Sequence, residues 1–467
     1  MNKRLTLILA LAFVAGIACA AYAEVQNVKV SGDLTVLGIS RNLSLNGAKN
    51  NNDTSSIASI TRLRVDADLT DNVMTTVRLL NERYWDSETD NVNTTSDPNT
   101  EIALDLAYVT LKEFLYSPLS LTIGRQELHF GNDMIVGDYD TNNITSSASP
   151  FAIQSVAIIR DADLSARKAF DSIRATLNYD PLVVDAVFAK VTNNNTQMIG
   201  NDDTNLFGVN ANYKVDDNTT AEAYWFQKNR GKKALATSGT GGIKKSDRVD
   251  TIGMRAVNTS IENLVLNGEL AYQFGKYAPD TTTAAAGSAN RKAWALETAA
   301  TYNMPEVKYT PSVTALYAYF SGDHELDDYT TNSGTYRGWD PMYENQRFGD
   351  IANAQFDQTN AHILGGIAIA RPADDVILKG EYYAYWWAKA YQDNSTVSTR
   401  RGDSLSMSER RFVGQEVDLT ATYDYTEDVQ FALMGGWFVP GPSIDKETSS
   451  VKTKVASEII GSMKVTF

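Results

Sequence analysis

Cysteine is almost absent from this chain: Cys19 is the only one in 467 residues. It lies in a segment that we expect to be removed, so the mature chain has no disulfide to stabilise it. Histidine is nearly as scarce, and His129, His324 and His362 form no paired metal motif. The sequence also lacks a phosphate-binding P-loop, a dinucleotide fingerprint and a G-x-S-x-G nucleophile motif. These absences argue against a disulfide scaffold, a metal site and an enzyme, and we expect no cofactor.

Residues 1–23 have the features of a secretory signal peptide. Two basic residues are followed by an apolar stretch over residues 5–17 and by the small-residue cleavage sequence A-Y-A at 21–23. We therefore expect the mature chain to begin at Glu24. The alternative is a lipoprotein with Cys19 as the lipidated residue, but the residues before it lack the leucine of that motif.

Long apolar runs are missing beyond the signal peptide. No stretch of 18 or more apolar residues follows it, so we expect no membrane-spanning helix. Removal of the signal peptide leaves 40 basic residues against 57 acidic ones, a net charge of −17. This balance excludes a nucleic-acid partner. It suits surface loops that face a lipopolysaccharide layer bridged by divalent cations.

What the sequence does contain is strand periodicity. Residues 62–69 (R-L-R-V-D-A-D-L) and 416–425 (E-V-D-L-T-A-T-Y-D-Y) alternate polar and apolar side chains without a fault. A period of two places one set of side chains on each face of a sheet. Helical spacing is hard to find after the signal peptide. The pattern predicts an all-β protein.

The connections between these segments alternate strictly between short and long. Eight short turns separate nine long polar stretches, which lie at about 41–57, 86–100, 129–168, 192–203, 229–247, 278–290, 322–357, 390–410 and 440–454. Seventeen connections join 18 strands. Short periplasmic turns and long extracellular loops are typical of a transmembrane up-and-down antiparallel β-barrel, which we predict over residues 24–467. Residues 152–160 resemble a further strand. We place them in the third loop, because counting them alone as a strand would give the barrel an odd number of strands.

Aromatic residues provide an independent indication of two membrane interfaces. Tryptophans fall near the outer ends of the predicted strands, at Trp85, Trp225, Trp294, Trp386, Trp387 and Trp437. Tyrosines fall near the inner ends, at Tyr179, Tyr213, Tyr302, Tyr309 and Tyr425. The chain closes with an alternating strand that ends in Phe467, the type of signal that the barrel-assembly machinery reads. We therefore predict that the protein resides in the outer membrane of a Gram-negative-type envelope.

The polar face of each predicted strand should point into a water-filled lumen, where a charged side chain stays hydrated and costs little free energy. The basic candidates for this wall are Lys29, Arg62, Arg64, Arg78, Arg174, Arg255, Lys379 and Lys464. The acidic candidates are Asp33, Asp66, Asp68, Glu82, Asp105, Asp185, Glu222, Glu269, Glu297, Glu381, Glu416, Asp418, Asp424 and Glu458. Such charges either pair across strands and hold the wall together or select permeating solutes. The same charges can serve both roles.

The longest predicted loops are 129–168 and 322–357. A loop of this length with no evident secondary structure is usually functional. Our hypothesis is that the loop 129–168 folds into the barrel and narrows the pore. Deletion of residues 142–150 should then raise the single-channel conductance.

The segment I-G-R-Q-E-L-H-F-G-N-D at 123–133, followed by V-G-D-Y at 136–139, resembles the G-R-Q-E-L-x-[YF]-G motif of the alginate-export family. The hairpin that contains A-F-D-S-I-R at 169–174 and V-D-A-V-F-A at 184–189 resembles the next hairpin of that family. Together the two cover about residues 120–190. The motif positions carried over are Arg125, Gln126, Glu127, Gly131, Asp138, Asp171 and Arg174.

The resemblance implies a monomeric 18-stranded barrel, which in the founding members has a basic lumen and conducts an anionic polysaccharide. This chain departs from that pattern in charge, because its predicted wall holds more acids than bases. Arg125 also falls on the lipid-facing side of its strand. A bulge or a position at the membrane rim would resolve this.

We predict an outer-membrane channel for passive diffusion of small hydrophilic solutes, in contact with outer-membrane lipid and lipopolysaccharide. The first alternative is an export channel for an acidic exopolysaccharide, working with periplasmic and inner-membrane partners. The second is a surface receptor or adhesin whose barrel is plugged. Ion selectivity distinguishes the first alternative, and negligible conductance distinguishes the second.

Overall fold

The computed structural model describes residues 27–45, 53–85, 102–138, 163–192, 203–231, 233–234, 243–244, 246–278, 288–323, 334–393, 395–400, 404–444 and 453–467. The predicted signal peptide and the segment 152–160 lie outside the described residues. Within the described ranges nearly all regular structure is β-strand. No helix among these residues is long and apolar enough to cross a membrane.

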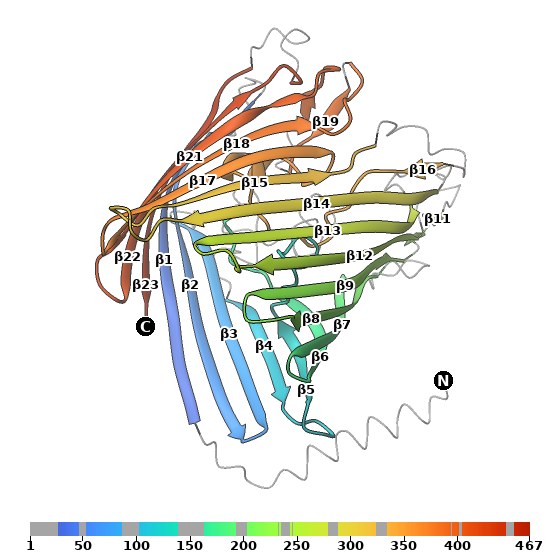
Figure 1. Ribbon diagram of the computed structural model, residues 1–467, viewed down its shortest axis with the longest axis vertical. Helices are drawn as coiled ribbons and strands as arrows, with labels where there is room; N and C mark the ends of the chain where they lie inside the picture. Colours follow the sequence, from blue (N-terminus) through green and yellow to red (C-terminus); the bar gives the residue numbers. More distant parts are fainter. Residues whose placement is uncertain are drawn as a thin grey trace, which may run out of the picture.

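Eighteen strands of the described chain form the wall of a closed antiparallel barrel (Figure 1). They are β1 (Asn27–Asn42), β2 (Asp53–Thr70), β3 (Val73–Tyr84), β4 (Ala103–Leu111), β5 (Leu119–Gln126), β6 (Phe170–Asn178), β7 (Leu182–Thr192), β8 (Thr204–Lys214), β9 (Thr219–Arg230), β12 (Asp247–Asn258), β13 (Leu264–Tyr277), β14 (Ala289–Asn303), β15 (Ser312–Phe320), β17 (Ala361–Ala373), β18 (Val376–Trp387), β21 (Phe412–Asp424), β22 (Val429–Pro440) and β23 (Ala456–Thr466). Each strand pairs with the next, and β1 pairs with β23 to close the sheet. The predicted 18-stranded barrel is confirmed.

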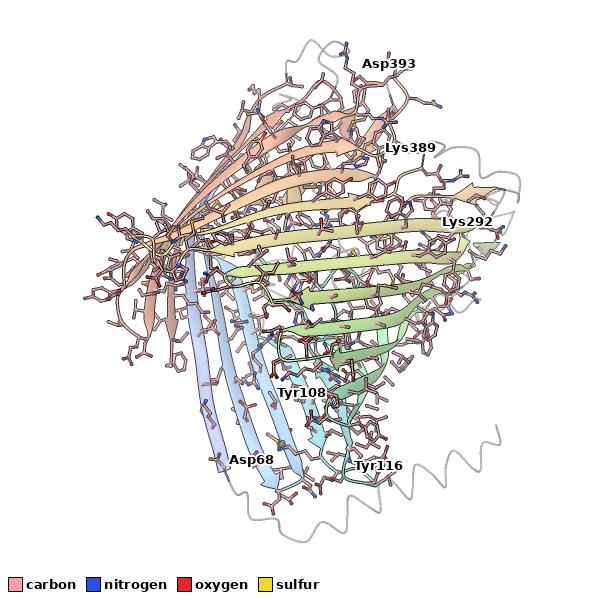
Figure 2. All side chains as sticks on the ribbon, in the orientation of Figure 1. Asp68, Tyr108, Tyr116, Lys292, Lys389 and Asp393 are labelled. Atoms are coloured by element: carbon pink, nitrogen blue, oxygen red, sulfur yellow. The ribbon has the colours of Figure 1, made fainter. Side chains whose placement is uncertain are left out.

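The connections divide the barrel into two ends. Short turns join the strands at one end, which we call the turn end, and long connections join them at the other, the loop end. In Figure 2, Asp68 and Tyr116 mark the turn end, whereas Lys292 and Lys389 mark the loop end. The long connections carry short extra strands and one short helix, namely β10 (Lys233–Ala234), β11 (Ile243–Lys244), β16 (Thr335–Tyr336), β19 (Thr396–Ser398), β20 (Ser404–Ser406) and α2 (Asp350–Gln355). The sequence did not predict this helix.

The two faces of the wall differ as the alternation predicted. On β2, Leu63 is 41% exposed on the outer face, while Arg62 and Arg64 lie half-buried on the opposite face. A β-bulge between β3 and β4 modifies the pattern, because Asp105 and its neighbour Leu106 are both buried there. The bulge keeps the carboxylate of Asp105 inside, 2.5 Å from Nε of Arg78.

The aromatic residues largely follow the predicted girdles. Trp85, Trp294 and Trp437 are exposed near the loop ends of their strands, as large apolar side chains at a lipid interface are. The expected place of Trp387 in the outer girdle is wrong. Its side chain is only 5% exposed and packs edge-on against Phe356 inside the barrel. The last position of β18 thus contributes to the interior rather than to the lipid face.

The chain end completes the closure of the barrel. The backbone N–H of Gly32 on β1 donates to the carbonyl of Phe467, and the N–H of Phe467 donates back to the carbonyl of Gly32. The ring of Phe467 covers Gly32, where an added Cβ would lie 2.6 Å from ring atom Cζ. The glycine leaves room for the terminal ring at the seam between the first and last strands.

Candidate functional site

The segment 127–138, which follows β5, enters the barrel. At its start Glu127 accepts a hydrogen bond from the guanidinium of Arg78 on β3. Four residues later the N–H of Gly131 donates to Glu222 on β9 at 2.9 Å. Strands β3 and β9 belong to different parts of the wall, so a segment that contacts both crosses the interior. We call residues 127–138 the first inner segment. The remainder of this loop over 139–162, with the residues of the deletion test, lies outside the described residues.

A row of charged side chains on the wall meets the first inner segment. Arg255 on β12 lies opposite Glu222 on β9 and opposite Glu269 on β13, and Glu269 lies opposite Glu297 on β14. We call these four residues the acidic row. Arg255 is 3.5 Å from the carboxylate of Glu222. One arginine cannot neutralise three carboxylates, so the row retains negative charge when its carboxylates are ionised.

Asn132 joins the first inner segment to the acidic row. Its backbone N–H donates to Glu269 at 2.7 Å, and its side-chain Oδ1 accepts from Nε of Arg255 at 2.6 Å. The preceding Gly131 has a φ of +65°, a conformation that favours glycine. A Cβ there would lie 2.6 Å from Oε1 of Glu269. Both features of Gly131 allow the backbone to approach the wall closely.

A second segment, residues 334–360, lies beside the first. The N–H groups of Gly137 and Asp138 both donate to the carbonyl of Tyr343, at 2.8 and 3.0 Å, and the N–H of Tyr343 donates to Ile135 at 3.0 Å. We call residues 334–360 the second inner segment. The sequence predicted a long loop here but not its inward course. The signal that could have revealed it is a set of large apolar residues, such as Trp339, in an otherwise polar stretch.

Asp340 fixes the second inner segment to the wall. Its carboxylate accepts from Nζ of Lys228 at 2.6 Å and lies 3.7 Å from the guanidinium of Arg291. Its backbone N–H and C=O both hydrogen-bond the side-chain amide of Gln273. Burial works against ionisation, but Lys228 and Arg291 outweigh it and lower the pKa of Asp340 from 3.8 to about 2.

The helix α2 is held by Glu416, one of the predicted wall residues. Both carboxylate oxygens accept backbone hydrogen bonds, from Ile351 at 2.7 Å and from Ala352 at 2.9 Å. Gly349 precedes the helix with a φ of +79°, and a Cβ there would lie 2.5 Å from Glu416. The carboxylate of the neighbouring Asp418 is 3.4 Å from the N–H of Asp350. Glu416 and Asp418 are therefore buried beneath the second inner segment.

A buried ion pair joins this segment to the next long connection. Arg400 lies 2.5 Å from Glu344 and 2.8 Å from Asp357, and the Glu344 side chain is 2% exposed. Burial raises the pKa of Glu344, although Arg400 acts in the opposite direction. A charge this deeply buried is stable only with its partner in place.

Apolar side chains fill the space between the inner segments and the wall. The buried cluster includes Phe130 and Val136 from the first inner segment and Tyr343 from the second. From the wall it includes Phe226, whose ring centroid lies 5.1 Å from that of Phe130. The inner segments thus have a hydrophobic core of their own, which adds to the polar contacts that position them.

Several of the other predicted wall residues form cross-strand or same-strand ion pairs. These are Arg62 with Asp33 (2.9 Å), Arg64 with Asp66 (2.7 Å), Arg174 with Asp185 (2.7 Å), Lys379 with Glu381 (2.5 Å) and Glu458 with Arg41 (2.8 Å). Asp68 lies near the turn end of β2. The pairs support the interpretation that these charges hold the wall together. That they line a conducting pore stays a prediction.

The family-motif residues cluster where the first inner segment begins. Gln126 donates to the carbonyls of Thr122 and Ser172, both at 3.2 Å. Arg125 lies 3.6 Å from Asp171 across an unbroken register between β5 and β6, so it sits one residue from the end of its strand without a bulge. A bulge and a position at the membrane rim were the two expected explanations for the lipid-facing side of Arg125. The structure agrees with the position at the rim.

The motif continues to the far end of the same segment. Asp138 forms an ion pair with Lys168, which precedes β6. Together with the contacts of Glu127 and Gly131, this pair fixes the path of residues 127–138. The motif thus builds an inward turn. In the described part of the chain, no group of three or more His, Cys, Asp or Glu side chains is placed to hold a metal ion.

The barrel resembles solved outer-membrane proteins of Pseudomonas aeruginosa. OccK3 (OpdO) matches with a TM-score of 0.54 and 10% identity over 95% of this chain and 97% of its own. OpdQ matches with 0.52 and 13% identity over 95% and 99%, and OpdK with 0.52 and 10% identity over 95% and 100%. At such identities the likeness concerns the fold alone. No curated protein matches the sequence.

The family comparison covers almost the whole barrel. Residues 29–457 match the family described as alginate export. This range runs from β1 into β23 and includes both inner segments. With the closed 18-stranded barrel, the match establishes an outer-membrane channel architecture. The chain belongs to the alginate export family of outer-membrane β-barrel proteins.

Proposed function

We propose that this protein is a passive diffusion channel for small hydrophilic solutes, with its narrowest part between the two inner segments and the acidic row. The observation that carries the proposal is the pairing of the inner segments inside the barrel. Tyr343 accepts two backbone hydrogen bonds from the first inner segment and donates one to it. Two segments bound to each other and to several strands of the wall reduce the free cross-section of the lumen.

The charge of the narrow part supports a preference for cations. Within the acidic row, Arg255 is the single basic residue beside the three carboxylates of Glu222, Glu269 and Glu297. The basic wall residues Arg62 and Arg174 are each paired with an aspartate. Net negative charge beside a narrow passage concentrates cations and repels anions.

The second candidate is export of an acidic polysaccharide, and the family description favours it. Such a chain would have to pass the acidic row, and its carboxylates would be repelled there. Reversal potential in a salt gradient across a planar bilayer distinguishes the two. We expect a cation preference; a strong anion preference would favour polysaccharide export.

Solute size gives an independent test. In proteoliposome swelling assays, monosaccharides should enter quickly and oligosaccharides slowly if the inner segments set the limiting width. Equal rates for both would contradict the proposed constriction. Absence of both conductance and swelling by a correctly folded barrel would instead indicate a plugged receptor or adhesin.

A further inference from the structure

A polar cavity of about 280 Å³ lies beside the acidic row, between the wall and the second inner segment. Its polar lining comes from Asn132, Asn267, Glu297, Thr298, Tyr317, Asn345, Gln346 and Arg347. The volume is at the lower end of the range of small-molecule sites. Since the cavity adjoins the proposed constriction, the inference below rests on the proposed function.

Three hydrogen-bond acceptors at this cavity have no donor in the described part of the chain. They are Oε1 of Glu297, Oδ1 of Asn267 and Oε1 of Gln346. Glu297 is only 7% exposed, so its carboxylate is more than nine-tenths buried. Buried acceptors in folded proteins nearly always have a partner. The side chains that carry these three acceptors all line the same cavity, and N–H donors of a ligand bound there would satisfy them.

The orientation of the two amides is determined by their other contacts. Nε2 of Gln346 donates to the carbonyl of Asn132 at 2.9 Å and to Oε2 of Glu297 at 2.7 Å. Nδ2 of Asn267 donates to Oδ1 of Asn132 at 2.9 Å. Turning either amide around would place oxygen against oxygen. The unpartnered atoms of these two side chains are therefore the amide oxygens, which are acceptors.

The charge of the cavity favours a cation. The described contacts of Glu297 come from the neutral side chains of Gln346 and Asn132. Arg255 pairs with Glu222 at the other end of the acidic row. Arg347 also lines the cavity, but its guanidinium is paired with Asp350 at 2.5 Å. The carboxylate of Glu297 is thus available to a positively charged ligand.

We propose that this cavity binds the primary ammonium group of a small cationic solute, with Glu297, Asn267 and Gln346 as acceptors. An ammonium group carries one positive charge and three N–H donors. These match one carboxylate oxygen and two amide oxygens. A quaternary ammonium ion has the same charge but no N–H donors.

The test compares butylammonium with tetramethylammonium, which have equal charge and equal numbers of heavy atoms. Each is added to single channels in planar bilayers that carry potassium chloride current. We expect butylammonium to reduce the current at a concentration at least tenfold lower than tetramethylammonium. Equal potency of the two ions on the natural protein would overturn the proposal, because it would show selection by charge alone.

Two variants locate the effect. Glu297→Gln keeps the shape of the side chain and removes its charge, and it should bring the two ions within about twofold of each other. Asn267→Leu removes one acceptor, while Oδ1 of Asn132 keeps its bond from Arg255. This variant should lose part of the discrimination. Glu306→Gln, at an exposed position near the turn end, removes one charge far from the cavity and should change nothing.

Folding and function are separated by two further readouts. Heat-modifiable gel mobility shows whether each variant forms a barrel; if Glu297→Gln does not, Asn267→Leu still tests the site. If the natural protein conducts no current, the proposed function fails, but calorimetric titration of the detergent-solubilised protein with butylammonium still tests the cavity. Binding that Glu297→Gln weakens at least tenfold supports the site, and equal binding by both proteins contradicts it.

Discussion

The backbone N–H of Asn132 donates a 2.7 Å hydrogen bond to the carboxylate of Glu269, across 137 residues of sequence. This bond joins a loop that leaves the wall after β5 to a strand on another part of the barrel. Because the donor is a backbone group, the bond itself requires no particular side chain at position 132. The contact depends instead on how closely the backbone can approach, which Gly131 determines.

The first prediction concerns that approach. Gly131→Val introduces a Cβ at 2.6 Å from Glu269 and a branched side chain at a φ of +65°. The first inner segment should move away from the acidic row, giving a larger and noisier single-channel conductance. The barrel itself should still form. Gly38→Val is the matched control, since a Cβ at Gly38 meets nothing within 4 Å. An unchanged conductance in Gly131→Val would show that this contact does not set the pore width.

The second prediction concerns the effect of low pH on the second inner segment. The pKa of Asp340 is lowered to about 2 in the folded protein from an ordinary value of 3.8. Its ionised form therefore stabilises the bound state of the second inner segment by about 2 kcal/mol. This contribution is complete above pH 3.8 and is lost as the pH falls toward 2. The protection of residues 334–343 against hydrogen exchange, measured relative to the intrinsic exchange rate at each pH, should fall over that window.

Asp340→Asn provides the control for the acid prediction. Without the carboxylate, Lys228 and Arg291 lose a shared partner at every pH. Exchange in the second inner segment should then be fast already at neutral pH and should show no further step between pH 4 and 2. A step of the same size in the variant would assign the acid response to another group.

The third prediction concerns the buried pair of Arg400 and Glu344. Removing one partner leaves the other charge buried and unpaired, which costs about 3–5 kcal/mol. Arg400→Met should therefore release the second inner segment locally, while the strands of the barrel stay protected. Hydrogen exchange measured segment by segment checks this. The double variant Arg400→Met with Glu344→Gln should regain part of the protection, because the uncompensated carboxylate is gone. A uniform loss of protection across all strands would contradict a local role.

The wall of the barrel was predictable from the sequence because strand alternation is a local property. Arg62, Leu63 and Arg64 differ in polarity, and a period of two alone decides which of them faces lipid. The even count of strands followed from the alternation of short and long connections. Lipid outside and water inside impose this pattern on every strand, so no tertiary information is needed.

The interior was less predictable because its contacts join distant residues. Glu416 was expected on the wall, but its use as the acceptor for two N–H groups of α2 depends on a loop that precedes it by more than 60 residues. The course of the second inner segment likewise depends on Asp340, Lys228 and Arg291 from three separate elements. Almost every residue has a backbone N–H group, so the sequence does not show which of these groups a carboxylate will bind. The motif around Gly131 indicated the family from the sequence. Its structural role, a close approach of the backbone to Glu269, became visible only in the structure.

The fourth prediction concerns closure of the barrel at Gly32 and Phe467. These residues exchange two backbone hydrogen bonds, at 2.8 and 3.0 Å, and the terminal ring covers the glycine. Gly32→Val would place a Cβ 2.6 Å from the ring and from the carbonyl oxygen of Arg62. Overpacking of this kind costs about 1–3 kcal/mol. We expect a clear fall in the fraction of folded barrel, measured by heat-modifiable mobility after refolding into detergent.

The control for closure lies on the same seam. Gly461 on β23 pairs with Gly38 on β1, and a Cβ at Gly461 meets nothing within 4 Å. Gly461→Val should therefore fold as the natural protein does, although it adds the same side chain to the same pair of strands. Phe467→Ala in the Gly32→Val background should restore part of the folded fraction, because it removes the ring that the valine meets. If both glycine variants fold equally well, the packing of Phe467 on Gly32 does not limit closure, and the backbone pairing alone holds the seam.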